Sequence, residues 1–434
     1  MTDIQIPGPE AAGTATTPAP QTKVGSRNPP TVFVGRQPIF DAQRSVMGYE
    51  LLFRSSAKNA ADHQDANQAT LRTIDNTLNV LGLREMVGNK LAFVNFTRDL
   101  ILQHSYKVLP SQQTVIELLE DMQIDDTLIE ACRQMKKAGY FVALDDFVFT
   151  PEYQPLLEIA DLVKLDVIKS DLATCHAIIE RFQRPGLSFL AEKVETYEVF
   201  EKMKRIGCRY FQGYFFCRPE VLSAQPIAGA KHLYLKLIND LVATPLDLAR
   251  VEATIKADVS LSLKLLRYLN SAAVGLPQRV SSIMQAMALL GEEKLKQWGA
   301  LVAVTCLSED KPVELARICL ARARFCELQD KWIKVQNREL DLFLLGLLSA
   351  IDALVDRPKS DILKDLSLVP EIKEALLGGS NALGKLLLIV IACERGDFKR
   401  ATLVGRMLGL PDEQVAVSFK QATQWADVVM TSAV

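Results

Sequence analysis

The first half of the chain alternates short apolar runs with longer segments in which apolar residues recur every three or four positions. Short runs rich in β-branched and aromatic residues are typical of buried strands in a parallel sheet, whereas the longer period marks one face of a helix. The alternation predicts strand–helix–strand units with right-handed crossovers. The expected strands are residues 31–40 and 46–53, two runs that end at Asn95 and Glu117, and residues 141–147, 162–167, 187–194 and 210–215.

Only a polar turn, Asp-Ala-Gln-Arg-Ser, separates the first two runs, and this spacing predicts an antiparallel hairpin. Helices are expected between later strands, at residues 66–81, 125–138, 173–183 and 197–206. About eight strands in roughly 190 residues fit a compact closed barrel. The sequence therefore predicts an α/β barrel of the TIM type with a modified first strand pair.

The pattern changes near residue 225, and from His232 onward it is helical throughout. The expected helices there include residues 246–257, 261–272, 283–290, 292–305, 313–333 and 340–354. Residues 1–30 are rich in Pro, Ala, Thr and Gly and are expected to be a disordered tail. We therefore expect a tail at 1–30, a barrel domain at 31–225 and an all-α domain at 226–434.

Charge and hydropathy exclude several classes of protein. The 50 Lys and Arg residues nearly balance the 52 Asp and Glu residues, which argues against bulk nucleic-acid binding because that usually needs a basic face. No apolar run approaches the roughly 20 residues that cross a bilayer, and no secretory leader is evident at the N-terminus. The eight cysteines include no C-x-x-C pair, so we expect reduced, buried thiols and a cytoplasmic protein without a zinc site.

Polar side chains stand where five of the expected strands end. These residues are Asn95, Glu117, the adjacent Asp145 and Asp146, Lys164 with Asp166, and Glu192 with Glu195. Carboxylate and carboxamide oxygens suit Mg²⁺, Mn²⁺ or Ca²⁺, and two such ions about 4 Å apart can clamp a phosphodiester. A single strand-end acid is commonly a helix cap or a loop ion pair, but five strands that end in this way favour a ligand site at one end of a barrel.

Short motifs follow one another along residues 31–220. They are Gln37-Pro38-Ile39, Glu50-Leu51-Leu52-Phe53-Arg54, Asn95, Glu117-Leu118-Leu119-Glu120, Leu144-Asp145-Asp146-Phe147, Lys164-Leu165-Asp166, Ala191-Glu192-Lys193-Val194-Glu195-Thr196 and Gln212-Gly213-Tyr214. In residues and order they resemble the motifs of the EAL family of phosphodiesterases, which open cyclic di-GMP to linear pGpG with Mg²⁺ or Mn²⁺. The resemblance implies the barrel fold of that family.

The resemblance also implies roles, residue by residue. The catalytic residues would be Glu192 as general base, Lys164 beside the water nucleophile, and Glu50. The metal ligands would be Glu50, Asn95, Glu117 and Asp145 for a first ion and Asp146 for a second. The supporting residues would be Glu120, Asp166, Glu195 and Gln212, and Gln37 and Arg54 would contact the dinucleotide.

Two departures from the family pattern bear on turnover. Relatives usually continue after D-D-F with a Gly- and Ser-rich loop that couples dimerisation to catalysis, whereas this chain has Val148-Phe149-Thr150-Pro151-Glu152-Tyr153. Glycine permits backbone angles that Val, Phe and Pro do not. Lys193 replaces the glycine of A-E-G-V-E and adds bulk and charge beside Glu192. Slow or conditional hydrolysis therefore fits the sequence as well as full activity does, and a homodimer stays an open alternative.

In the helical half, residues 257–272, 280–283 and 286–291 resemble the HDOD domain, a relative of HD hydrolases that lacks their metal site. No histidine follows His232, which fits that resemblance. We expect a regulatory module that binds a protein partner. Two functions stay open: a cyclic di-GMP phosphodiesterase, or a catalytically impaired receptor or scaffold that acts on motility or surface attachment. Unused ligands of a buried metal site are costly to keep unpaired, which favours the enzyme.

Overall fold

The computed structural model describes residues 32–55, 83–120, 122–218, 229–269, 282–333 and 339–432. The expected tail at 1–30, the expected helix at 66–81 and the end of the helix expected at 261–272 lie outside these residues. From residue 31 onward the chain forms one compact unit. The domain division near residue 225 therefore stays a prediction.

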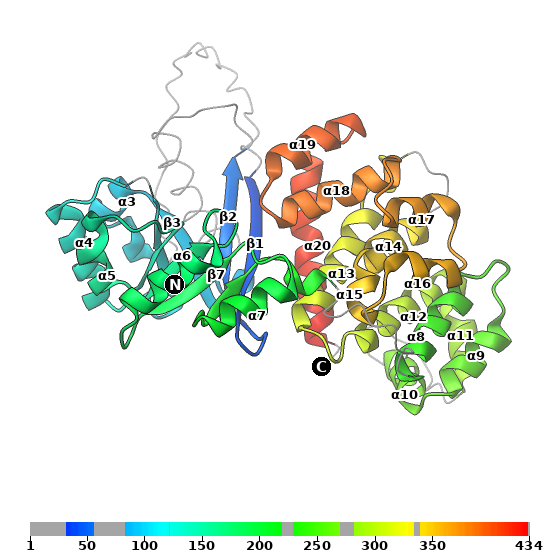
Figure 1. The fold of residues 1–434 in the computed structure, drawn as a ribbon. Helices are drawn as coiled ribbons and strands as arrows, with labels where there is room; N and C mark the ends of the chain where they lie inside the picture. The colour runs from blue at the N-terminus through cyan, green and yellow to red at the C-terminus, as the bar shows by residue number, and fades with distance from the viewer. Residues whose placement is uncertain are drawn as a thin grey trace, which may run out of the picture. The chain divides into compact units, whose positions relative to one another are not determined.

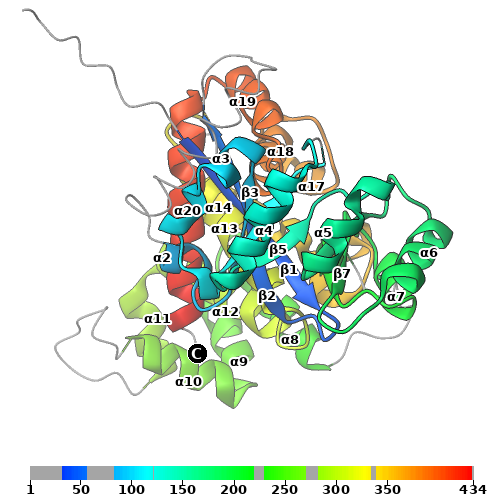
Figure 2. The same cartoon turned by 90° about the vertical axis from the view of Figure 1, so that its left-hand side faces the viewer.

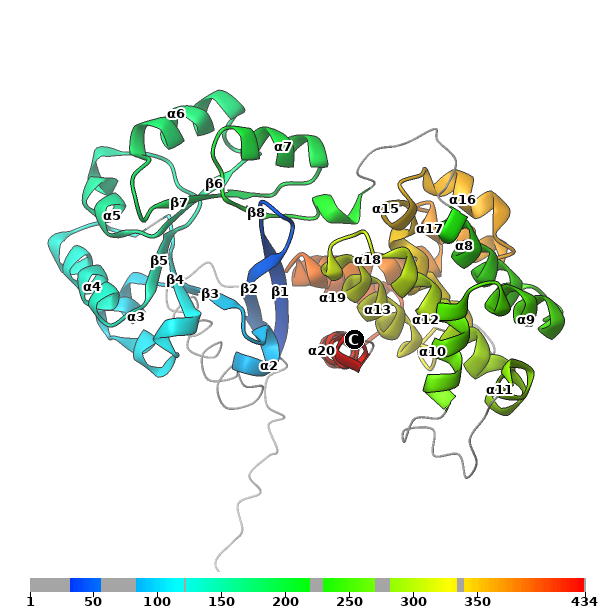
Figure 3. The same cartoon turned by 90° about the horizontal axis from the view of Figure 1, so that it is seen from below.

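The first half of the chain closes into a barrel of eight strands, which pair in chain order (Figures 1 and 3). β1 is antiparallel to both β2 and β8, and the other neighbouring strands are parallel. This confirms the predicted barrel with a modified first strand pair. The strands are β1 (Val32–Asp41), β2 (Val46–Ser55), β3 (Leu91–Phe96), β4 (Thr114–Leu118), β5 (Phe141–Leu144), β6 (Leu162–Asp166), β7 (Ser188–Glu192) and β8 (Tyr210–Gln212).

A layer of apolar side chains fills the interior of the barrel and fixes where the polar residues lie. The layer consists of Ile39, Phe93, Val115, Ala143, Leu162 and Leu190. Because side chains along a strand alternate between its two faces, a residue two positions away from a layer residue also points inward. This rule places Gln37, Asn95, Glu117, Asp145, Lys164 and Glu192 together, directly beyond the layer. The apolar layer is thus the floor of the candidate site.

Helices cover the outside of the barrel, and α4 shows why they form. The Asp125 side chain accepts a hydrogen bond from the Leu128 backbone N–H at 2.9 Å and caps the first turn of α4. Leu128, Cys132 and Met135 then recur on one buried face. The helices of this half are α2 (Leu83–Val87), α3 (Arg98–Leu102), α4 (Asp126–Lys137), α5 (Gln154–Ile159), α6 (Leu172–Phe182) and α7 (Tyr197–Arg205), with the 3₁₀ turns η2 (Ser105–Val108), η3 (Ser111–Gln113), η4 (Pro151–Tyr153) and η5 (Phe215–Cys217).

The described residues of the second half contain helices and no strand, as the sequence predicts (Figures 1 and 2). The helix expected at 313–333 ends at Glu327, and the one expected at 340–354 is divided by a 3₁₀ turn. The elements are α8 (Gly229–Val242), α9 (Leu248–Lys256), α10 (Val259–Leu269), α11 (Ile283–Leu290), α12 (Glu292–Leu307), α13 (Val313–Glu327), α14 (Glu339–Leu347), η6 (Leu348–Ala350), α15 (Ile351–Val355), α16 (Lys359–Asp365), α17 (Pro370–Leu376), α18 (Ala382–Glu394), α19 (Phe398–Met407) and α20 (Asp412–Ser432).

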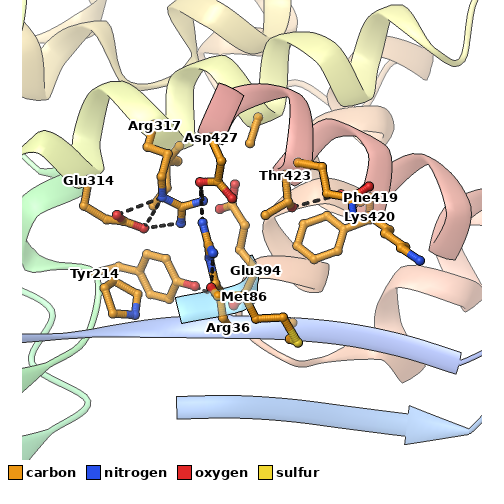
Figure 4. Close-up of a pocket in the computed structure, with 15 residues that line it drawn as sticks. Arg36, Met86, Tyr214, Glu314, Arg317, Glu394, Phe419, Lys420, Thr423 and Asp427 are labelled. Carbon is orange, nitrogen blue, oxygen red and sulfur yellow. Dashed lines mark hydrogen bonds and ion pairs between the residues drawn. The ribbon is translucent and has the colours of Figure 1, made fainter. Parts of the chain in front are cut away.

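The first barrel hairpin packs against the helices through a buried network of charged groups (Figure 4). β1 contacts α18 and α20. Arg317 Nε donates to both oxygens of Glu314 at 2.8 Å, and the Tyr49 hydroxyl donates to Glu314 Oε2 at 3.3 Å. Arg36 on β1 pairs with Asp427 on α20. Arg36, Glu314, Arg317 and Asp427 line a cavity of about 70 Å³ between β1, α13 and α20, so the junction is charged and internally paired.

Among the helices that the structure describes, none combines the length and the apolar character needed to cross a membrane. All eight cysteines are free, and seven of them are buried. The expectation of buried, unpaired thiols is therefore confirmed.

Candidate active site

Lys164 lies at the centre of a group of four carboxylates at the carboxyl end of the barrel. Its fully buried Nζ is 2.7 Å from Glu117 Oε1, 2.8 Å from Asp145 Oδ1 and 2.8 Å from Glu192 Oε1. Glu50 Oε2 is farther away, at 3.5 Å. The three shorter contacts are ion pairs, and the contact with Glu50 has the geometry of a hydrogen bond that Lys164 donates. The structure thus brings together one acid from β2, one from β4, one from the residue after β5 and one from β7.

Amide side chains orient the fourth acid, Glu50. Gln212 Nε2 donates to Glu50 Oε2 at 2.6 Å and is also 3.0 Å from Gln37 Oε1. Asn95 Nδ2 donates to Glu50 Oε1 at 3.2 Å. Gln37, Asn95 and Gln212 therefore join the acids at one site, as the motif positions predict.

Four buried carboxylates around one ammonium leave an excess of negative charge, and this excess shifts their ionisation. Burial raises the pKa of Glu192 to about 7, although Lys164 opposes the shift. Burial also raises the pKa values of Glu117 and Asp145. For Glu50 the attraction of Lys164 and the two amide hydrogen bonds outweigh burial, so its pKa is lowered. Glu192 is thus poised to exchange a proton near neutral pH.

The oxygen atoms of this site suit a hard divalent cation. Asn95 Oδ1, Glu117 Oε2 and Gln212 Oε1 are buried without a hydrogen-bond partner, which is costly unless another group satisfies them. Oxygen-only donors are the ligands that Mg²⁺, Mn²⁺ and Ca²⁺ prefer. Among the described residues, no three acidic, histidine or cysteine side chains are arranged around one metal position. The three closest acids are directed at Lys164 instead.

Asp146 belongs to a separate ion-paired group, although it follows Asp145 directly. The chain turns here, because Asp145 N–H donates to Leu118 O and Phe147 N–H donates to Lys164 O, both at 3.0 Å. Asp146 has a left-handed backbone (φ +43°), and its Oδ2 accepts from Lys169 Nζ at 2.6 Å. The structure therefore does not bring Asp146 into the group around Lys164.

Lys193 supplies the second cation of this outer group. Its Nζ pairs with Asp166 and lies 3.8 Å from Asp146 Oδ1. Lys193 has a φ of +57°, a conformation that costs an L-residue about 1 kcal/mol and that glycine adopts freely. This chain therefore places a lysine in a backbone conformation that glycine adopts more easily.

Aromatic packing fixes the loop that follows the two aspartates. The Phe149 and Phe182 rings are 4.8 Å apart, and the Arg181 guanidinium lies 4.2 Å from the Phe149 ring centre. The Tyr153 hydroxyl donates to the Glu120 carbonyl at 3.1 Å. The predicted departure from a glycine-rich loop therefore produces a loop that is anchored to α6, while Val148 stays 62% exposed.

A cleft of about 410 Å³ opens above the carboxylate group. Two of its lining residues, Arg395 and Gly396, come from the turn between α18 and α19, and sequence reasoning did not find them. Glu195 lies at the rim, where its Oε2 accepts from Arg218 Nη2 at 2.8 Å. The side chain of Arg54, the predicted contact of the dinucleotide, lies outside the described part of the structure. Glu120 is 3.5 Å from Lys169 Nζ and belongs to the outer group.

A closed barrel with an acidic, oxygen-rich group at its carboxyl end, followed by a helical half, defines a class of two-part protein. The sequence model of the EAL domain family matches residues 64–219, and that of the HDOD domain matches residues 229–356. The chain is 33% identical over 399 residues to the cyclic di-GMP phosphodiesterase CdgJ of Vibrio cholerae, covering 91% of this chain and 92% of that protein. The chain belongs to this family of EAL–HDOD proteins.

Two further proteins illustrate the likeness. The uncharacterised protein YuxH of Bacillus subtilis is 34% identical over 407 residues, which is 92% of this chain and 99% of that protein. Among solved structures, the PaMucR phosphodiesterase in complex with c-di-GMP is 21% identical and matches 43% of this chain and 95% of that chain with a TM-score of 0.37.

Proposed function

We propose that the protein binds cyclic di-GMP in the cleft and hydrolyses it to linear pGpG with the help of Mg²⁺ or Mn²⁺. The observation that carries the proposal is the convergence of Glu50, Glu117, Asp145 and Glu192 at the carboxyl end of an EAL-type barrel. The printed name of the relative CdgJ supports the same substrate and reaction.

In this proposal each side chain has a distinct task. Glu50, Asn95, Glu117 and Asp145 hold the first cation, and Asp146 holds a second. A divalent cation there supplies activation of a water molecule and charge neutralisation at the phosphodiester. Glu192, with a pKa of about 7, accepts the proton of the attacking water, and Lys164 orients that water.

The remaining predicted residues support these groups. Gln212 and Gln37 fix the orientation of Glu50, and Asp166 holds Lys193. Glu120 and Glu195 lie farther out, in ion pairs at the rim. Arg54 contacts the dinucleotide.

Product analysis tests the reaction. The purified full chain is incubated with cyclic di-GMP and Mn²⁺, and linear pGpG is quantified by anion-exchange chromatography. We expect pGpG from the wild type and none from Glu50→Ala, which removes a cation ligand. Equal amounts of pGpG from both proteins, or none from either, would reject the enzymatic proposal.

A receptor is the second candidate, and the outer ion-paired group favours it. Asp146, the residue for a second cation, is held by Lys169 at 2.6 Å, and Lys193 takes the place of a glycine beside it. Micromolar binding of cyclic di-GMP by calorimetry, without pGpG, would identify a receptor. In either case we propose that the HDOD half binds a protein partner; the homodimer and the cytoplasmic location stay predictions.

A further inference from the structure

We propose that Arg395, in the turn between α18 and α19, is a ligand-binding residue of the cleft and takes a phosphate oxygen of the cyclic dinucleotide. The inference rests on the proposed function, which names the ligand. Arg395 comes neither from the barrel nor from residues 229–356, which the HDOD model matches. The C-terminal segment would thus complete a site that the barrel alone leaves open.

Arg395 lines the same cleft as the carboxylate group. The lining of the cleft includes Glu50, Asp145 and Glu192 together with Arg395 and Gly396. The guanidinium carbon of Arg395 lies 5.3 Å from the centre of the Tyr214 ring. Its side chain is 47% exposed, so its donors are open to a ligand.

Among the described residues that line the cleft, two side chains are basic, Lys193 and Arg395. Arg395 is less tightly ion-paired and is therefore more accessible to an anionic ligand. The other, Lys193, pairs with Asp166 and lies near Asp146. Arg395 Nη1 is 3.8 Å from Glu195 Oε1, whereas Glu195 is held more closely by Arg218 at 2.8 Å. An anionic ligand that enters among five acids needs a cationic partner, and the guanidinium fork matches a phosphate group.

The turn that carries Arg395 is fixed from both sides. The Tyr214 hydroxyl donates to the Glu394 backbone carbonyl at 2.6 Å. The buried Glu394 carboxylate accepts from Arg322 Nε at 2.8 Å and Nη2 at 2.7 Å. Gly396 has a φ of +72°, and a Cβ there would lie 2.7 Å from Leu52 Cδ1. Because barrel and helices both hold the turn, little ordering of its backbone is needed when a ligand binds.

Calorimetric titration of the full chain with cyclic di-GMP in the presence of Ca²⁺ tests the inference. We expect Arg395→Ala to raise the Kd about tenfold or more, because it removes a hydrogen bond between charged groups. Arg395→Lys should recover part of the loss, since it keeps the charge without the planar fork. Arg400→Ala removes the same charge from an exposed position on α19 and should leave the Kd unchanged.

The outcomes separate the inference from the proposed function. A wild type that binds and an Arg395→Ala protein that binds equally well would overturn the inference alone. Absence of binding by the wild type would overturn the proposed function and this inference with it. Equal melting temperatures of the variants, together with a weaker Kd for Arg395→Ala and partial recovery by lysine, would support a direct contact over a structural role.

Discussion

Lys164 is the residue on which the balance of charge at the strand ends depends. It is fully buried and faces four carboxylates, and their attraction outweighs the effect of burial and raises its pKa well above the usual range. A buried cation of this kind neutralises only part of the surrounding charge. The ionisation of Glu117, Asp145 and Glu192 therefore depends on whether this ammonium is present.

Replacing Lys164 with methionine should destabilise the protein. The change leaves four buried acids without their counter-charge, which costs about 3–5 kcal/mol. The acids should then bind protons in the folded state at higher pH than in the unfolded state, so the deficit should shrink as the pH falls from 7 towards 5. Urea unfolding at both pH values measures this. Lys169→Met, at a half-exposed ion pair, is the control, and an equal loss in both variants would contradict the prediction.

Lys193 offers a test of the proposed second-cation position. Lys193→Gly should relieve about 1 kcal/mol of backbone cost and release Asp146 and Asp166 from an ammonium. We expect faster pGpG formation with Mn²⁺ and little change in stability. Lys193→Ala removes the ammonium but keeps the left-handed backbone strain, so its rate of pGpG formation should rise less than that of Lys193→Gly. Rates unchanged in both variants would show that Lys193 does not limit turnover.

At the scale of elements, the close approach of the chain after β8 to the chain after β7 shapes the rim of the site. Gly213 has a φ of +144°, and a Cβ there would lie 2.1 Å from the Val194 carbonyl oxygen. Val194 N–H also donates to Gln212 O at 2.9 Å, so the two segments are joined at this point. The backbone, and not a side chain, requires glycine in the Gln212-Gly213-Tyr214 motif.

Gly213→Ala should therefore destabilise the fold far more than a glycine substitution that costs only backbone strain. Gly88 is the matched control, since it also has a positive φ (+61°) but a Cβ there would meet nothing within 4 Å. We expect Gly88→Ala to lower the free energy of unfolding by about 1 kcal/mol and Gly213→Ala to lower it several times as much. Thermal unfolding of both variants measures the two losses. Similar losses of stability in the two variants would contradict the prediction, because the chain after β8 could then move away from the chain after β7 at little cost.

The sequence predicted the order of the strands and the acids at their ends, because period-two patterning and apolar runs are local signals. It placed the ends of β5, β7 and β8 too late, because the apolar residues Phe147, Val194 and Phe215 follow each strand closely although the backbone has already turned away. It also grouped Asp145 with Asp146. Sequence adjacency cannot show that the turn sends the first to Lys164 and the second to Lys169.

For the whole molecule, the charged junction between β1 and the helices gives stability a pH dependence. Burial alone would raise the pKa of Glu314, but Arg317, Arg36 and the Tyr49 hydroxyl outweigh burial and hold it below its usual range. A carboxylate with a lowered folded pKa contributes stability above its unfolded pKa of about 4.3, and the contribution is lost as the pH falls through the folded value.

Glu314→Gln should accordingly lower the free energy of unfolding by about 3–5 kcal/mol at pH 7, because Arg317 stays buried with only the more distant Asp427 as a counter-charge. The difference between variant and wild type should narrow below about pH 4, where the wild-type carboxyl takes up a proton. Chemical unfolding of both proteins at several pH values from 7 to 3 measures this difference in stability. A difference that stays constant with pH would contradict the role of the ionised pair.

The position of Arg395 at the cleft could not be predicted from the sequence. It is separated by 183 positions from Gln212, and no local pattern distinguishes it from the other arginines of the helical half. Its place at the cleft follows from packing between β1, β2 and the turn after α18. A short sequence motif does not predict contacts between segments so far apart in the chain. Glu117, Asp145 and Glu192 could be predicted to meet because the parallel strands of one barrel end at the same edge. Glu50 was predicted from the motif resemblance, whereas nothing in the sequence required the turn after α18 to meet these acids.

The ammonium at the centre of the four acids has a consequence for the order of assembly. Proteins whose acidic ligands are neutralised only by a metal ion fold when the ion arrives and unfold when a chelator removes it. This barrel carries a covalently attached counter-ion, so its strands can close in a cell poor in free cations. If the protein binds the cations of the proposed function, metal loading would then be a late and reversible step that folding of the barrel does not require.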